Sequence, residues 1–223
     1  MYTKYLIVIL TFIFFPLFGQ IKLEFCLIDS VAHVSIYNNS KNNYALPIDQ
    51  YHFRPYEKDC DAFSDHEVEF PDFGLMLNAV DPDGKKEEYV IGYNKTDDSN
   101  SLAKEIQSKR DNLKQMVLTW GKTNNIKDYK LAFMNYRLMN NLIYLKPGEK
   151  TSFKIKLDLY NITAQELIFY NYILEKSKKY KLYLSLCRVK NVNQYLTSAQ
   201  KKKLKEYKIY TGNLESNNIE LIQ

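Results

Sequence analysis

The chain has 223 residues, 45% of them hydrophobic, and a formal net charge of +5, which excludes a wholly disordered protein. Seven Gly and six Pro exclude collagen-like and Pro/Gly-linker classes, whereas 19 Tyr and 12 Phe favour a β-rich protein. Because acidic and basic residues nearly balance and Lys greatly outnumbers Arg, the sequence lacks the strongly basic field of nucleic-acid-binding proteins, and we expect no nucleic-acid partner.

The first 19 residues have the pattern of a secretory signal peptide. Lys4 gives a positive start, an apolar run extends from Leu6 to Phe18, and Gly19 is a small residue at the expected cleavage site. As a helix this run would span about 20 Å, against about 30 Å for the hydrocarbon core of a bilayer, which favours cleavage over a retained anchor. We therefore predict signal peptide 1–19, no membrane span in the mature chain, and export to the periplasm, the cell surface or the medium.

The start of the mature chain shows the alternating apolar pattern of half-buried strands. The segments 21–27, 32–36 and 44–48 follow this period of two, and the dipeptide at 29–30 predicts a turn between the first two. Pro47 favours an edge position for the third strand, because proline cannot donate a hydrogen bond to a sheet.

A long loop and a hairpin are predicted next. Residues 49–72 are polar, acidic and aromatic, which indicates a loop, and strand spacing resumes over 73–79. The Asp-Pro-Asp-Gly sequence at 81–84 predicts a tight turn. Because apolar residues return at 89 and 91, we expect a β-hairpin here.

The β pattern is interrupted over residues 94–130. Four apolar residues share one helical stripe and predict a helix near 102–117. The segment is too short to form a core of its own, so we interpret it as a helix-containing insertion in a single domain that spans 20–223.

The C-terminal part alternates between strand and helix signals. Strands are expected at 153–159, 180–186, 209 and 219–221. The sequence at 163–166 fits a capping box and predicts a helix over 167–174, and a second cap is expected at 197–200. Eight to ten short strands with two or three helices predict a mostly β protein with an immunoglobulin-like antiparallel β-sandwich.

Several segments resemble exported immunoglobulin-like sandwich proteins of Bacteroidota. The resemblance rests on the first strands, on 145–149, 180–184 and 212–221, and on a composition rich in Lys, Asn, Ile and Tyr, and it covers about half of the mature chain. Tyr180 lies where such folds often place a tyrosine corner. The resemblance implies a fold and a compartment but no catalytic residue, and the usual inter-sheet Cys…Trp…Cys pattern is not identified in the sequence.

The three cysteines, Cys26, Cys60 and Cys187, permit one disulfide and one free thiol in an exported chain. A pairing of Cys26 with Cys187 across a sandwich is one alternative. Small buried hydrophobic residues are the other, and the sequence leaves the pairing open.

An acidic segment is the strongest candidate for a metal site. The candidate ligands of calcium or zinc are Asp59, Asp61, Asp65 and His66, because carboxylate oxygens suit calcium and imidazole suits zinc. No EF-hand or zinc-site spacing accompanies them, so a solvated acidic loop is the simpler interpretation and no cofactor is otherwise indicated.

The sequence contains no nucleophile elbow, phosphate loop, dinucleotide fingerprint or metalloprotease motif, and it therefore nominates no catalytic residue. The leading hypothesis is an exported, non-catalytic binding or envelope-assembly module whose partner is an envelope or extracellular protein or glycan. Long loops on a rigid framework often carry function, so 49–72 and 94–130 are the expected contact surfaces. The alternative is a metal-dependent or carboxylate-based hydrolase that uses the acidic loop 59–69.

Overall fold

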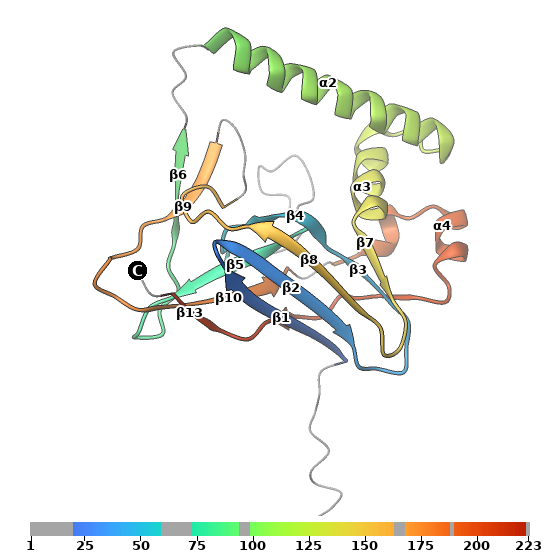
Figure 1. Cartoon of the computed structure of the whole chain (residues 1–223). Coiled ribbons are helices and arrows are strands. Elements are labelled where there is room, and N and C mark those ends of the chain that lie inside the picture. Colours follow the sequence, from blue (N-terminus) through green and yellow to red (C-terminus); the bar gives the residue numbers. More distant parts are fainter. Residues whose placement is uncertain (1–19, 59–72, 94–98, 163–167, 188–189, 222–223) are drawn as a thin grey trace, which may run out of the picture.

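The computed structural model describes residues 20–58, 73–93, 99–162, 168–187 and 190–221, and every structural statement below concerns these residues. The described chain is mostly β, with several largely antiparallel sheets and three α-helices (Figure 1). The expectation of a mostly β protein is confirmed at this level.

The first sheet has the strand order β1-β2-β8 and is antiparallel throughout. Its strands are β1 (Ile21–Ile28), β2 (Val31–Asn38) and β8 (Lys150–Lys156). Asp29 and Ser30 form the β1–β2 turn, both with positive φ, as the sequence predicts for this position. Burial alternates along β1 and β2, so one face of the sheet points to the core and the other to solvent.

The second sheet has the order β12-β10-β5-β4, with β13 also paired to β10. Its strands are β4 (Asp49–Arg54), β5 (Gly74–Val80), β10 (Tyr180–Leu186), β12 (Leu214–Glu215) and β13 (Ile219–Leu221). The prediction of a loop over 49–72 is wrong for its first part, which forms β4. This polar segment becomes a strand because it pairs in parallel with β5, although the register shifts within it.

The third sheet has the order β11-β3-β7, with β3 (Tyr44–Pro47), β7 (Leu142–Leu145) and β11 (Lys208–Ile209). The expected edge position of β3 is wrong, because the strand pairs on both sides. Pro47 is tolerated because the short β11 pairs only with the first two residues of β3.

A two-stranded sheet of β6 (Tyr89–Tyr93) and β9 (Ile168–Tyr172) corrects two further predictions. The turn at 81–84 forms, and an antiparallel bridge between Val80 and Lys86 continues it as a short hairpin, but β6 leaves β5 and pairs with β9. The predicted helix over 167–174 is replaced by β9, and its proposed cap at 163–166 lies outside the described residues. The cross-strand partner therefore decides between two competing local patterns.

Tyr172 joins this small sheet to the second sheet. Its hydroxyl donates a 2.6 Å hydrogen bond to the Leu77 carbonyl and accepts a 2.8 Å hydrogen bond from the Tyr56 N–H. Burial raises the pKa of this phenol above its ordinary value. Because the ring is almost fully buried, Tyr172 ties β9 firmly to β5.

The main core lies between the sheets, and side chains from the first, second and third sheets meet in it. Fully buried members include Val34, Leu46, Phe53, Leu77 and Leu184. This shared burial is the main stabilising contribution to the β framework, since each fully buried large apolar side chain contributes about 1.5–3 kcal/mol.

The helices are α2 (Ser99–Thr123), α3 (Tyr129–Asn140) and α4 (Ser198–Lys203), with a short 3₁₀ turn, η1 (Val192–Tyr195). The helix expected near 102–117 exists and is longer, whereas α3 was not predicted. The cap at 197–200 is confirmed, since Thr197 and Gln200 form a capping box. Among the described residues, no helix combines the length and apolar character needed to cross a bilayer.

Candidate functional site

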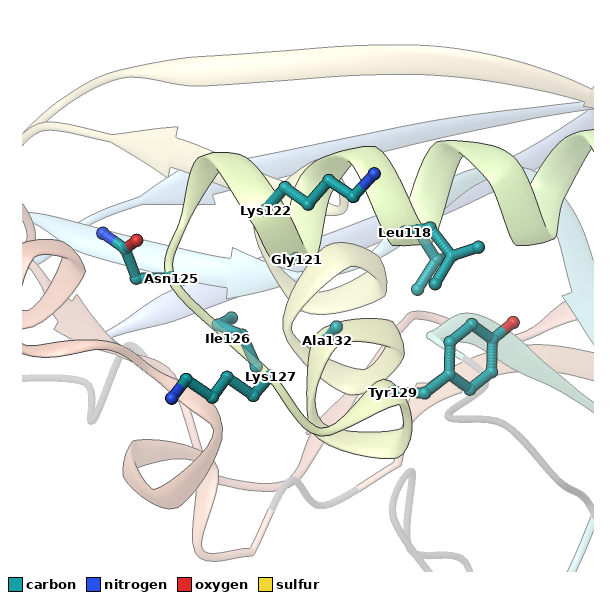
Figure 2. A pocket seen from close by; sticks show the side chains of 9 residues that line it. Leu118, Gly121, Lys122, Asn125, Ile126, Lys127, Tyr129 and Ala132 are labelled. Carbon is teal, nitrogen blue, oxygen red and sulfur yellow. The ribbon is translucent and has the colours of Figure 1, made fainter.

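A hollow lies where α2 turns back into α3. It has a volume of about 380 Å³. We call it the α2–α3 groove and define it by its lining residues: Val117, Leu118, Gly121, Lys122, Asn125, Ile126, Lys127, Tyr129 and Ala132. Figure 2 shows that Leu118 from α2 and Tyr129 from α3 extend to the same side, with Ile126 and Ala132 between the two helices.

Helix α2 is held mainly by its own local contacts over most of its length. Its sequence is rich in good helix formers, and Glu105 pairs with Lys109 one turn later at 2.9 Å. From 104 to 116 every side chain is exposed except Ile106 and Leu113, which are half-buried. In Figure 1 the helix runs across the top of the view, apart from the sheets, and its C-terminal end lies beside α3. The helix therefore presents a long solvated surface next to the groove.

The reversal between the two helices is fixed by local chemistry. The Ile126 N–H donates to the Gly121 carbonyl at 2.8 Å, and Asn125 adopts a left-handed conformation. Asp128 caps α3 by accepting a 2.7 Å hydrogen bond from the Leu131 N–H. A Cβ at Gly121 would lie 2.9 Å from the Ile126 carbonyl oxygen, so this close approach requires glycine.

The floor of the groove is part of a packed cluster. Val117, Ala132 and Phe133 are buried against one another where α2 meets α3, and Leu113 and Ile126 pack on them. Because buried, well-packed side chains resist displacement, the groove is a preformed concave surface.

A buried polar network fixes α3 from one side. The Asn135 side chain accepts hydrogen bonds from Trp120 Nε1 and Gln200 Nε2, and it donates to Gln200 Oε1 and the Tyr195 carbonyl, at 2.5 to 2.9 Å. All hydrogen-bonding capacity of this amide is used, and the side chain is fully buried. Residues from α2, α3, η1 and α4 are thereby joined at one point.

A buried carboxylate fixes α3 from the other side. Asp49 Oδ2 lies 3.6 Å from Arg137 Nη2, and Asp49 Oδ1 lies 3.4 Å from His52 Nδ1 and accepts from the Tyr51 N–H at 2.9 Å. Burial alone would raise the pKa of Asp49, but the hydrogen bonds from His52 and Tyr51 and the charge of Arg137 outweigh it and lower the pKa below its ordinary value. Asp49 therefore stays ionised and holds α3 against β4.

The helical hairpin, residues 99–140, concentrates the positive charge of the protein. It contains eight Lys or Arg and three Asp or Glu, a net charge of +5 that equals the formal charge of the whole chain. Lys122 and Lys127 line the groove and are exposed, and within the described ranges no carboxylate forms an ion pair with either. Figure 2 places Lys122 on the α2 side and Lys127 on the loop side of the hollow. The groove thus combines an apolar floor with two lysines in its lining, whose ammonium groups extend in opposite directions (Figure 2).

The predicted metal ligands Asp59, Asp61, Asp65 and His66 lie outside the described residues, so the metal site stays a prediction from the sequence. In the portion that is described, no three His, Cys, Asp or Glu side chains are grouped so that they could hold a metal ion. His52, just upstream of the acidic segment, belongs to the Asp49 cluster instead.

The structure decides whether Cys26 and Cys187 form a disulfide with each other. Cys26 is a free, exposed thiol on β1, and Cys187, at the end of β10, is disulfide-bonded. A Cys26–Cys187 disulfide is therefore excluded.

The sequence predicted only part of the groove. The expected contact surface 94–130 contains α2 and all of the lining except Ala132, but Tyr129 and Ala132 are positioned by α3, which was not predicted. The available signal was Asp128, a good N-cap residue, followed by apolar residues at helical spacing. Comparison of the chain with protein-family models, curated proteins and solved structures found no match.

Proposed function

We propose that this protein is an exported binding module, not an enzyme, in which an immunoglobulin-like β-sandwich presents the helical hairpin 99–140 to a partner. The partner class is a protein or glycan of the envelope or the extracellular space. The observation that carries the proposal is the preformed α2–α3 groove, with an apolar floor and two exposed lysines in its lining, at the end of a helix that lies apart from the sheets.

Two observations support the sandwich framework. The first and second sheets bury their facing side chains in one shared core, which is the basic arrangement of a β-sandwich. The Tyr180 hydroxyl accepts a 3.0 Å hydrogen bond from the Glu175 N–H, five residues upstream, and the ring is buried. This backbone contact is similar to that of a tyrosine corner.

Two observations support export. The first 19 residues have the charge and apolar pattern of a signal peptide. The disulfide at Cys187 suits an oxidising compartment, because thiols in the cytosol are kept reduced.

The proposal is tested by affinity capture of the tagged full-length chain from its native cells after light crosslinking. The wild type is compared with Leu118→Ser/Tyr129→Ser, which removes two apolar groups from the groove. The matched control is Tyr160→Ser/Ile173→Ser, which removes two side chains that are 69% and 68% exposed elsewhere.

We expect a protein or glycan partner to be recovered with the wild type and the control variant and to be lost with the groove variant. Equal recovery by all three chains would show that the groove is not the binding surface. N-terminal sequencing of the same sample should give Gln20 as the first residue, and a start at Met1 would contradict cleavage of the signal peptide.

A further inference from the structure

The α2–α3 groove has a chemistry that selects among partners. Its volume of about 380 Å³ lies near the lower end of the range for ligand pockets, which suits one bulky apolar group better than an extended ligand. Its lining is mostly apolar, and the polar side-chain groups of its lining residues are the Asn125 amide, the Tyr129 hydroxyl and the two lysine ammonium groups.

The electrostatic environment adds a second requirement. Lys122 and Lys127 carry positive charge at the border of the groove, and the surrounding hairpin has a net charge of +5, whereas the rest of the chain is close to neutral. A partner that brings carboxylates to this border would gain two ion pairs and would be steered toward the hairpin during association. A basic partner would be repelled.

We infer that the α2–α3 groove binds an acidic segment of another protein, which inserts one bulky apolar side chain into the hollow and sets carboxylates beside Lys122 and Lys127. This inference rests on the proposed function and names the chemistry of the partner at the same site. The apolar anchor contacts Leu118, Ile126 and Tyr129, and Asn125 is available for a hydrogen bond to the backbone of the segment.

An anionic membrane is a less suitable partner for this positively charged hairpin than an acidic protein segment. An interfacial helix needs a continuous apolar face, and the exposed surface of α2 between 104 and 116 is dominated by Lys, Arg, Gln, Asn, Asp and Glu. The apolar surface is instead concentrated in a hollow, which receives a protruding group and not a flat lipid surface.

The test is selection from a random peptide library displayed on phage, panned on the mature chain. Peptides that also bind the Leu118→Ser/Tyr129→Ser variant are removed, so that only groove-dependent peptides remain. Their dissociation constants are then measured by fluorescence anisotropy with the wild type, with Lys122→Gln/Lys127→Gln and with Lys201→Gln/Lys202→Gln. The last variant removes the same charge from exposed positions on α4.

We expect the groove-dependent peptides to combine a bulky apolar residue with flanking Asp or Glu. Loss of two exposed ion pairs should weaken their binding about two- to thirtyfold in Lys122→Gln/Lys127→Gln. The α4 variant should change it less than about twofold, since its charges lie outside the groove. Thermal melting of each variant ensures that a folded chain is compared.

The possible failures are distinguishable. Groove-dependent peptides that lack acidic residues, or that bind the Lys122→Gln/Lys127→Gln variant equally well, overturn the acidic partner and leave the binding module intact. If no groove-dependent peptide is found, the result counts against both the acidic partner and the binding module. A third outcome would identify a lipid surface as the partner in place of a protein segment. In that case the chain sediments with phosphatidylglycerol vesicles, Lys122→Gln/Lys127→Gln does not, and the selection yields no acidic peptides.

Discussion

Replacement of Asn135 by alanine should destabilise the helical hairpin by about 2–4 kcal/mol. The substitution removes four hydrogen bonds and leaves Trp120 Nε1 and the Tyr195 carbonyl without this partner, while the Gln200 amide loses two contacts. A buried polar group without its partner costs about 1–3 kcal/mol. Trp120 and Tyr195 are only half-buried, so water recovers part of the loss, and the sum falls within the stated range.

The assay is urea unfolding followed by the fluorescence of Trp120, the single tryptophan of the chain, which donates directly to Asn135. With a typical m-value, the midpoint should fall by about 1–2 M. The matched control is Asn140→Ala on the same helix, where the exposed amide donates only to the Tyr136 carbonyl, and we expect a loss below about 0.5 kcal/mol.

The reasoning is refuted if Asn135→Ala loses no more stability than Asn140→Ala. A double-mutant cycle with Gln200→Ala sharpens the result, because the two amides contact each other directly. We expect a coupling of about 0.5–3 kcal/mol, and additive effects would show that the network does not act as a unit.

Two further predictions concern titration and thiol chemistry. Because the pKa of Asp49 is lowered in the folded state, its contribution to stability is present above about pH 4 and is lost as the pH falls through the lowered pKa. Asp49→Asn should therefore melt at a lower temperature than the wild type at pH 7, with a difference that shrinks in acid; a constant difference would contradict the ionised pair with Arg137. Iodoacetamide should label Cys26 in the native protein and Cys187 only after reduction, and peptide mapping that finds Cys187 labelled without reductant would disprove its disulfide.

Local sequence patterns determined the elements that have one clear buried face. The alternation over 21–27 and 32–36 specifies β1 and β2, because a shift of one residue would turn every apolar side chain to solvent. The capping box of α4 could also be predicted from the sequence, since both partners lie within four residues of each other. The helix near 102–117 followed from its apolar stripe.

Tertiary structure decided the elements whose partners are distant in the sequence. Residues 168–172 carry spacing compatible with a helix but form β9, because β6 supplies a paired strand more than 70 residues away in the chain. The polar segment 49–54 becomes β4 only because β5 lies beside it. The groove likewise exists only after α2 turns back at Gly121 and α3 packs on Val117. Local patterns report which face of an element is apolar, but they do not specify what that face packs against, and the candidate site forms only where two helices adjacent in the sequence pack on each other.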